Sequence, residues 1–491
     1  MVRPVGGFAA RRLRAGAALA SMLGIVLQWS DAEPLREAGV TEAGLSLERL
    51  RELSDAGEVD TVLVALTDLQ GRLQGKRVTA RFFFDEVVAN ATEACDYLLA
   101  VDVEMNTVSG YASSSWEDGY GDFVLRPDLS TLRLLPWHPA TALVLADVEL
   151  VEGGPVTVSP RQVLRRQLDR LAERGLTAYV GTELEFLLFK DTYEQAWSAG
   201  YRGLTPANQY NVDYSLLGTG RVEPVLRAIR NGMAGAGMYP ESAKGECNPG
   251  QHEIAFRYAD ALTTCDNHSV YKTGAKEIAA ALGHSLTFMA KYNEREGNSC
   301  HIHLSLREAD GTPVMAGDDE HGFSPLMRHF IAGQLAYLRE LTCLLAPNIN
   351  SYKRFAEGSF APTALAWGVD NRTCALRVVG HGQSLRVENR IPGGDVNPYL
   401  AVAAMVAAGL RGVDERLPLE DPLTGNAYTA AKPRVPTTLR EAADLFAAST
   451  VAVEDLGADV VDHYRNAATV ELRAFDAAVT DWERVRGFER L

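Results

Sequence analysis

The chain lacks the features that would place it in a specialised structural class. Its six cysteines contain no CxxC pair and are scattered, which favours reduced thiols over a disulfide framework. It has no internal repeat and no low-complexity tract outside Ala-rich stretches. A hydrophobic share of 46% with 23% charged residues is typical of globular proteins, so a disordered, collagen-like or coiled-coil chain is excluded.

Basic residues are outnumbered in this sequence. The chain has 48 Lys and Arg against 64 Asp and Glu, which gives a formal net charge of −16. An acidic protein repels phosphate backbones at long range, and no basic patch occurs beyond the N-terminus. The composition therefore predicts no nucleic-acid partner.

No apolar run is long enough for a typical membrane span. The longest candidate, residues 15–29, is about 15 residues long, where a span needs about 20. Four arginines precede this run, so a signal segment, a start codon placed too early and a disordered tail all fit. We treat residues 1–40 as an N-terminal extension and expect no membrane partner.

The next segment, residues 41–150, reads as a small strand-rich domain. The pattern predicts a helix over 45–56 and strands over 61–66, 97–101 and 142–148. Gly153, Gly154 and Pro155 follow, and Ser159-Pro160 has the capping hydroxyl and early proline of a helix start. A domain boundary near 150–160 is therefore expected.

Residues 155–491 are expected to form one large α+β domain. Short strand candidates alternate there with predicted helices. These helices are predicted at about 161–174, 222–236, 262–293, 325–345 and 397–412.

Acidic residues recur in two motifs of the large domain. Glu183 and Glu185 alternate with apolar residues in a strand-like run, so both carboxylates project from one face. Glu246 and Glu253 flank a Pro-Gly turn that can bring them together. A solvated strand edge and a surface turn would also explain these motifs.

Histidines and arginines follow the acids. His301 and His303 share one face of a predicted strand. Further along the chain, Arg354, Arg372 and Arg377 precede a run in which Arg386, Glu388 and Arg390 alternate with apolar or neutral residues. An exposed, salt-bridged strand is the simplest explanation of such a run.

Taken together, the motifs point to phosphoryl transfer. Carboxylate clusters with one or two histidines prefer Mg²⁺ or Mn²⁺, and Arg side chains clamp carboxylates and phosphates. A site in which metal ions bridge nucleotide phosphates needs carboxylates to hold the metals and arginines to hold the phosphates. The 71–77 segment is one residue too short between its glycines for a P-loop, and Gly218-Thr219-Gly220 lacks the third glycine of a dinucleotide motif.

The order of these motifs resembles the glutamine synthetase family from about residue 45 to the C-terminus. The resemblance implies a small N-terminal β-grasp domain and a large catalytic domain with a curved antiparallel sheet and surrounding helices. It also implies stacked rings of identical subunits, such as a dodecamer, with active sites between subunits.

Site residues carry over from the resemblance position by position. One metal ion would be held by Glu185, Glu246 and Glu253, and a second by Glu183, His301 and Glu388. The phosphate contacts would be His303, Arg372, Arg377 and Arg386. The glutamate pocket would contain Gly297, Arg354 and Arg390. Asp68 would be the acid that a neighbouring subunit offers to the incoming amine.

Two positions depart from the glutamine synthetase motifs. Phe360 stands where the family carries its catalytic glutamate, and a phenylalanine cannot accept a proton. Glu296 stands beside Gly297 where true glutamine synthetases usually carry Asn, and Glu357 is a candidate replacement carboxylate. These departures resemble the γ-glutamylamide ligase branch, which joins glutamate to polyamines, ethanolamine or other organic amines.

The resemblance therefore implies an ATP-dependent ligase that forms γ-glutamyl phosphate and passes the glutamyl group to an organic amine. ATP, two or more Mg²⁺ or Mn²⁺ ions, L-glutamate and an amine would be its ligands, and the cytoplasm its compartment. An ammonium-using glutamine synthetase is the alternative, and a metal-dependent amidohydrolase or a non-catalytic paralogue is a remote one.

Overall fold

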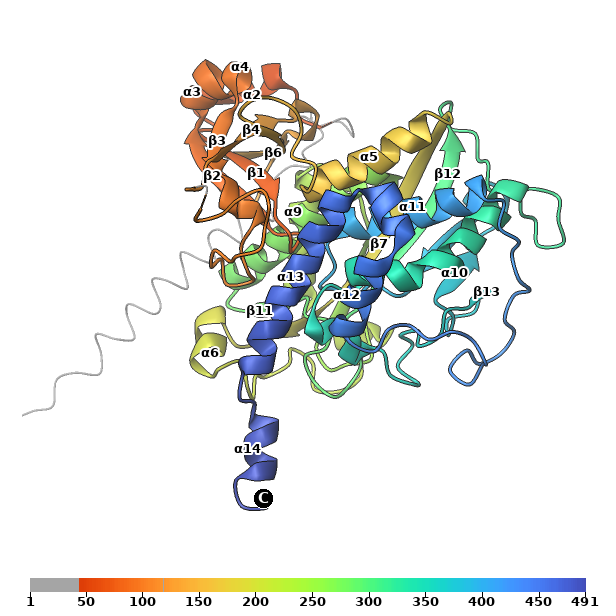
Figure 1. Cartoon of the computed structure of the whole chain (residues 1–491). Helices are drawn as coiled ribbons and strands as arrows, with labels where there is room; N and C mark the ends of the chain where they lie inside the picture. The colour runs from red at the N-terminus through yellow and green to blue at the C-terminus, as the bar shows by residue number, and fades with distance from the viewer. Residues whose placement is uncertain (1–43, 118) are drawn as a thin grey trace, which may run out of the picture.

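The computed structural model describes residues 44–117 and 119–491, which form a small N-terminal unit and a larger helix-and-sheet unit (Figure 1). The segment expected to be an N-terminal extension lies outside the described residues. Strand β6 of the small unit ends at Leu150, and helix α5 of the large unit begins at Pro160.

The small unit is built on a six-stranded sheet. Its strand order is β2-β1-β6-β4-β3, with β5 paired to β6. The β1–β6 pair is parallel, and the other pairs are antiparallel. The strands are β1 (Thr61–Thr67), β2 (Leu73–Thr79), β3 (Thr92–Cys95), β4 (Asp122–Pro127), β5 (Arg133–Leu134) and β6 (Thr141–Leu150).

The large unit contains a nine-stranded sheet in the order β13-β14-β15-β12-β7-β9-β8, with β10 and β11 also paired to β7. All its pairs are antiparallel except β13–β14. The strands are β7 (Leu176–Phe189), β8 (Pro240–Gly245), β9 (Gln251–Phe256), β10 (Ala259–Asp260), β11 (Ser285–Thr287), β12 (Cys300–Glu308), β13 (Trp367–Val369), β14 (Leu376–Val379) and β15 (Arg386–Asn389).

Helices surround this sheet, and α13 runs past both units toward the projecting α14 (Figure 1). The helices of the small unit are α2 (Leu47–Asp55), α3 (Ala80–Phe82) and α4 (Val88–Asn90). Those of the large unit are α5 (Pro160–Ala172), α6 (Tyr193–Ser198), α7 (Leu216–Thr219), α8 (Glu223–Gly235), α9 (Ala261–Ala281), α10 (Pro325–Leu345), α11 (Pro398–Asp414), α12 (Leu439–Ala448), α13 (Ala458–Ala477) and α14 (Asp481–Gly487).

Two predicted elements are wrong. The apolar run over 97–101 forms a 3₁₀ turn, Asp96–Leu99, rather than a strand. The helix predicted over 262–293 ends at Ala281, because Gly283 takes a positive φ of 72° and the chain then enters β11. A left-handed residue stops an α-helix, and glycine adopts this conformation without steric cost.

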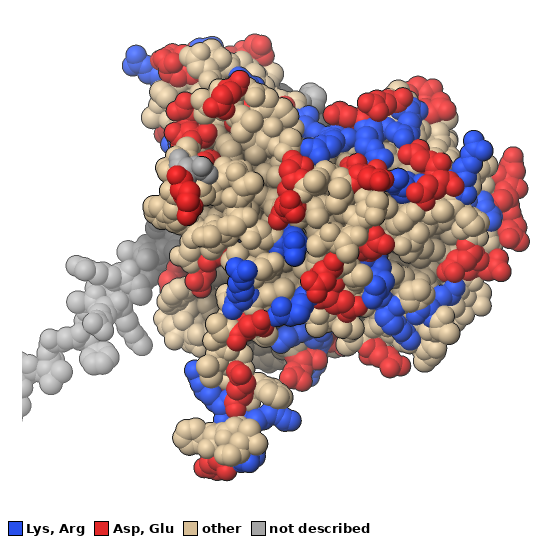
Figure 2. Space-filling view, in the orientation of Figure 1, with Lys and Arg blue, Asp and Glu red and all other residues tan. Residues whose placement is uncertain are grey.

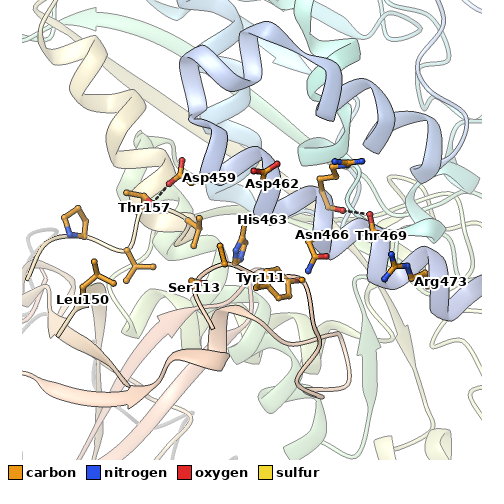
Figure 3. A pocket seen from close by; sticks show the side chains of 16 residues that line it. Tyr111, Ser113, Leu150, Thr157, Asp459, Asp462, His463, Asn466, Thr469 and Arg473 are labelled. Carbon is orange, nitrogen blue, oxygen red and sulfur yellow. Dashed lines mark hydrogen bonds between the residues drawn. The ribbon is translucent and has the colours of Figure 1, made fainter. Parts of the chain in front are cut away.

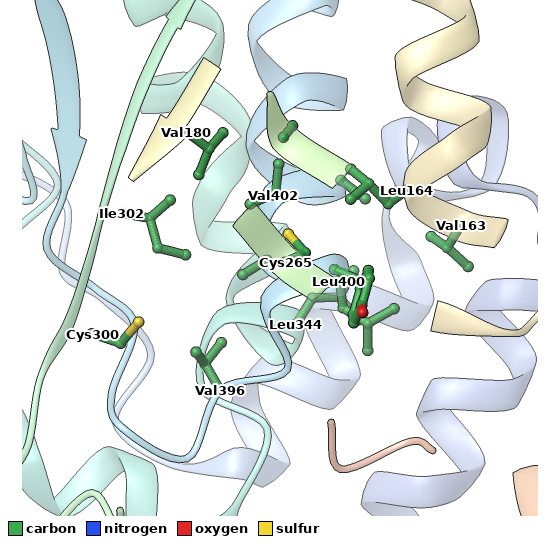
Figure 4. Close-up of a cluster of buried hydrophobic side chains, with 14 of the residues drawn as sticks. Val163, Leu164, Val180, Cys265, Cys300, Ile302, Leu344, Val396, Leu400 and Val402 are labelled. Atoms are coloured by element: carbon green, nitrogen blue, oxygen red, sulfur yellow. The ribbon is translucent and has the colours of Figure 1, made fainter. Parts of the chain in front are cut away.

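The core of the large unit lies between the sheet and its helices. Nearly every residue of α11 is buried, and its alanines and glycines let α10 approach closely. A Cβ added to Gly333 of α10 would lie 2.2 Å from the carbonyl oxygen of Ala408. Figure 4 shows Leu400 and Val402 of α11 beside side chains from the sheet and from α5 and α9.

One buried arginine joins the two units. Arg161 of α5 is 3% exposed and pairs with Asp128 at 2.7 Å and with Asp147 at 2.6 Å, both in the small unit. It also pairs with Asp266 of α9 at 3.0 Å. Since three carboxylates meet one guanidinium, Arg161 neutralises charge at the junction.

The surface carries both signs of charge. Basic and acidic side chains are interspersed over the face shown in Figure 2, without a large basic patch.

Within 44–117 and 119–491, no helix has the length and apolar character needed to cross a bilayer.

Candidate active site

Strand β7 places two carboxylates on one face of the large sheet. Leu184 and Phe186 are buried, whereas Glu183 and Glu185 point to the other side, as the alternation predicts. Glu183 lies opposite His301 of β12, and Glu185 lies opposite Glu253 of β9. Strand pairing thus brings together motifs that are far apart in the sequence.

Glu185, Glu246 and Glu253 form the first acidic cluster. Each contributes a carboxylate oxygen, and these oxygens lie within 4.8 Å of one another. Glu185 accepts hydrogen bonds from the Ser299 backbone N–H at 2.7 Å and from Gln251 Nε2 at 2.9 Å. Glu246 pairs with Lys244.

The first cluster carries an electrostatic cost in the metal-free protein. Burial raises the pKa of Glu253 well above its ordinary value, and the charges of Glu183 and Glu185 raise it further. Burial, followed by the charge of Glu246, also raises the pKa of Glu185. Lys244 and Arg354 lower the pKa of Glu185 but do not offset the effect of burial and of the neighbouring acid, so the cluster favours a further positive charge.

Glu183, Glu388 and two histidines form the second cluster. His301 Nδ1 lies 3.2 Å from Glu183 Oε2 and 3.6 Å from Glu388 Oε1. His303 Nε2 lies 3.0 Å from Glu183 Oε1, and its Nδ1 lies 3.2 Å from Arg386 Nε. Both histidines predicted as site residues therefore reach the same carboxylate.

Positive charges surround Glu388, which is fully buried. Arg377 Nη1 lies 2.7 Å from Glu388 Oε2, and Arg390 also pairs with Glu388. Burial opposes ionisation, but the charges of His301 and Arg390 outweigh it and lower the pKa of Glu388 to about 2. This group is an anion at neutral pH.

Both clusters fit hard divalent cations. Carboxylate oxygens with an imidazole are the ligand set of Mg²⁺ and Mn²⁺ sites. Burial of His301 lowers its pKa to about 4, so at neutral pH the imidazole is uncharged and can act as a ligand. Its Nε2 is buried without a hydrogen-bond partner.

A cavity of about 510 Å³ adjoins the second cluster. Its lining includes Glu183, His303 and Arg386 together with Tyr179, Tyr258 and Arg307. The guanidinium of Arg307 lies 5.1 Å from the ring centroid of Tyr179 and 5.8 Å from that of Tyr258. A site of this size, lined by both polar groups and aromatic rings, suits a nucleotide.

The predicted glutamate pocket has two buried arginines. Arg354 donates to Ser299 Oγ at 3.2 Å, and Arg390 donates to the carbonyls of Arg372 at 3.1 Å and Phe360 at 3.4 Å. A Cβ on Gly297 would lie 2.3 Å from the Ala290 carbonyl oxygen, so only glycine fits there. The hydrogen bonds of Arg390 to these two carbonyls fix both the arginine side chain and the backbone around it.

Two of the other predicted arginines, Arg377 and Arg386, contact the second cluster. Arg377 joins Glu388 to Asp370, whose Oδ1 lies 3.0 Å from Arg377 Nε. Arg386 donates to the carbonyl of Ser384 at 3.1 Å. The Arg372 side chain is exposed.

The segment that departs from the glutamine synthetase motifs is an exposed loop. Phe360 is 57% exposed and has a positive φ of 58°. Glu357 is also exposed, and no ion pair to it is present in the described part of the chain. The backbone carbonyl of Glu296 accepts from Asn248 Nδ2 at 2.7 Å.

Asp68 makes its contacts within its own turn. This residue is fully buried in the single chain, and its Oδ1 accepts from the backbone N–H groups of Gln70 and Arg72 at 2.9 Å each. Its Oδ2 lies 2.7 Å from Arg72 Nε. The carboxylate therefore closes the turn between β1 and β2.

Sequence reasoning missed several residues of the site. Ser305 and Arg307 share the face of His301 and His303, so the period of two could have found them. Lys244, which pairs with Glu246, carried no such signal. A cavity of about 890 Å³ lies between residues 110–113 and α13 (Figure 3), and none of the predicted site residues lines it.

Comparison with known proteins identifies the family to which this fold belongs. The catalytic domain of glutamine synthetase matches residues 157–486. The chain belongs to the glutamine synthetase family. Among solved structures, this family member resembles a GmaS complex with ADP, with a TM-score of 0.79 and 29% identity over 90% of this chain and 99% of that one. The expected fold class is thereby confirmed.

Relatives within the glutamine synthetase family include two amide-forming ligases. The chain is 69% identical to γ-glutamylethanolamide synthetase GlnA4 of Streptomyces coelicolor, over 91% of this chain and 96% of the relative. It is 37% identical to glutamate–isopropylamine ligase of a Pseudomonas species, over 89% and 97%. A glutamine synthetase of Thermotoga maritima is 29% identical, over 90% and 99%.

Proposed function

We propose that this protein is an ATP-dependent ligase that joins the γ-carboxylate of L-glutamate to a small primary amine of the ethanolamine class. The 69% identity with γ-glutamylethanolamide synthetase over nearly the whole chain carries the proposal. The exposed Phe360 loop supports it, because the ring replaces an acid that would attract ammonium. The carbon body of an organic amine can pack on such a ring, at about 0.8 kcal/mol for each buried methylene.

The two clusters are proposed to hold two Mg²⁺ or Mn²⁺ ions. Glu185, Glu246 and Glu253 would hold one ion. Glu183, Glu388 and His301 would hold the other, and a ring nitrogen of His303 also lies within 4.8 Å of carboxylate oxygens of Glu183 and Glu388. When bound, such ions neutralise phosphate charge and polarise the oxygens of the transferring group. His303 and Arg386, which line the 510 Å³ cavity, would contact the phosphates of ATP, together with Arg372 and Arg377.

The reaction has two steps that the chain's residues can position. A γ-carboxylate oxygen of glutamate attacks the γ-phosphorus of ATP, and ADP leaves with the electron pair of the broken P–O bond. The amine nitrogen, having lost a proton, then attacks the acyl carbon; the C–O bond breaks and inorganic phosphate leaves. Buried Arg354 and Arg390 would hold the glutamate by its charge.

We also propose assembly into stacked rings and action in the cytoplasm, where ATP and glutamate are available. The short helix α14 has no buried residue and projects from the body of the chain (Figure 1), which leaves surface for contacts between subunits. Light scattering coupled to size-exclusion chromatography gives the subunit number, and a monomer with full activity would contradict the assembly.

Phosphate release from ATP tests the proposed activity. Purified protein with Mg²⁺ and glutamate would be assayed with ammonium, ethanolamine, putrescine, spermidine, isopropylamine and aniline. We expect turnover with ethanolamine and little with ammonium. Turnover with ammonium alone would identify a glutamine synthetase instead.

Phe360→Glu should shift acceptor choice toward ammonium. A carboxylate at this position adds attraction for a small cation and removes apolar wall, so the ratio of kcat/KM for ammonium to that for ethanolamine should rise about tenfold, or about 1.4 kcal/mol. Steady-state kinetics with both amines measure this ratio. Phe360→Gln is the matched uncharged control, and an equal change in both variants would show that charge is not the cause.

A further inference from the structure

The segment 209–216 lies against the end of the first acidic cluster and was not among the predicted site residues. Val212 is fully buried, and its carbonyl oxygen accepts from the Ser215 N–H at 2.8 Å. The Tyr214 N–H donates to the Gly245 carbonyl at 3.4 Å. A Cβ on Gly245 would lie 2.3 Å from the Val212 carbonyl oxygen, so the segment packs directly on the backbone that precedes Glu246.

Asp213 projects from this anchored segment beside Glu246. Its Oδ2 lies 3.7 Å from the Sγ of Cys247, the residue after Glu246. Burial, together with the negative charges of Asp213, Glu246 and Glu296, raises the pKa of the Cys247 thiol to about 11. Three carboxylates thus converge on Cys247.

The Asp213 carboxylate is not used to hold the loop. The hydrogen bond within the loop is made by the Asn211 side chain, whose Oδ1 accepts from the backbone N–H of Asp213 at 2.8 Å. Asp213 is exposed, and its carboxylate accepts from the thiol of Cys247. Within 44–117 and 119–491 no cation pairs with it. An acid that only closed a turn would accept backbone N–H groups, as Asp68 does.

This corner of the site already holds a primary alkylammonium group. Lys244 Nζ pairs with Glu246 and lies 4.7 Å from the ring centroid of Tyr214. An aromatic face next to a carboxylate is a recognised arrangement for binding an organic cation. Because Lys244 is matched to Glu246, the charge of Asp213 remains available to a second ammonium group from solution.

We propose that Asp213 binds the ammonium group of the amine substrate, with the Tyr214 ring beside its carbon body. The proposal rests on the ligase function proposed above. Asp213 then determines which acceptors bind, since it favours amines that arrive as cations over neutral ones.

Asp213→Asn, an almost isosteric change, tests this role with two nucleophiles. Ethanolamine is charged at neutral pH, whereas hydroxylamine is largely uncharged. We expect the KM for ethanolamine to rise at least tenfold, with the KM for glutamate and ATP unchanged. Formation of γ-glutamyl hydroxamate from hydroxylamine should continue at the wild-type rate, which also shows that the variant is folded.

Two further variants complete the comparison. Asp213→Glu keeps the charge and should restore part of the ethanolamine affinity. Glu58→Gln removes an exposed carboxylate of the small unit and should change neither nucleophile.

Three results would overturn the assignment. An unchanged KM for ethanolamine in Asp213→Asn would show that the residue does not bind the amine. A raised KM for glutamate, together with slower hydroxamate formation, would place Asp213 at the glutamate instead. If the wild-type protein used neither nucleophile, the ligase function itself would be wrong.

Discussion

Glu253→Gln should reduce ATP turnover by at least about 100-fold and yet raise the melting temperature of the metal-free protein. Loss of groups that merely support metal ligands costs 10- to 100-fold, and Glu253 lies in the acidic cluster itself. Its pKa is raised in the folded chain and ordinary in the unfolded one, so ionisation at neutral pH favours unfolding. A neutral amide removes this penalty.

Two assays separate these opposite effects. Phosphate release measures turnover, and thermal unfolding with chelator or with added Mn²⁺ measures stability. The variant should lose most of the Mn²⁺-dependent stabilisation that we expect of the wild type. Glu308→Gln, at the exposed end of β12, is the control on the same sheet. Wild-type turnover in Glu253→Gln would remove Glu253 from the metal site.

Arg161→Leu should destabilise the protein by about 3–5 kcal/mol, the usual cost of breaking a buried charge cluster from one side. Asp266 is 3% exposed and would lose both of its hydrogen bonds to Arg161, at 3.0 Å each. Asp128 and Asp147 keep Arg165 as a partner, so the damage should fall mainly on the α5–α9 contact.

Denaturant unfolding, followed by tryptophan fluorescence, measures this loss. Arg174→Leu is the matched control, because Arg174 pairs with Asp414 at the surface, where such a pair contributes about 1 kcal/mol at most. Equal midpoints for the two variants would show that the Arg161 cluster does not stabilise the junction.

Strand periodicity predicted the centre of the site well. Residues that alternate along β7 and β12 must share a face, so the proximity of Glu183, Glu185, His301 and His303 followed from spacing and the family order of motifs. The family itself is confirmed by the match over residues 157–486. The glutamate–amine ligase class agrees with the names of two relatives.

The remaining site residues depend on contacts that no local pattern encodes. Asp213 lies in a loop without periodicity, and its position follows from the packing of Val212 on Gly245. Asp68 was assigned from the resemblance to the family, and its burial and its ion pair with Arg72 could not be predicted from the sequence. Arg161 meets Asp266 across 105 positions of sequence, beyond the reach of any window.

The division of the site between strands and loops also bears on how such enzymes diversify. A one-residue insertion within β12 would turn Ile302 and Leu304 toward the acids and His301 and His303 into the core, so that strand tolerates almost no change in length. Replacements at Asp213, Tyr214 or Phe360 leave every strand register intact. After gene duplication, one copy can therefore acquire a new acceptor through a few loop mutations while inheriting its nucleotide chemistry unaltered.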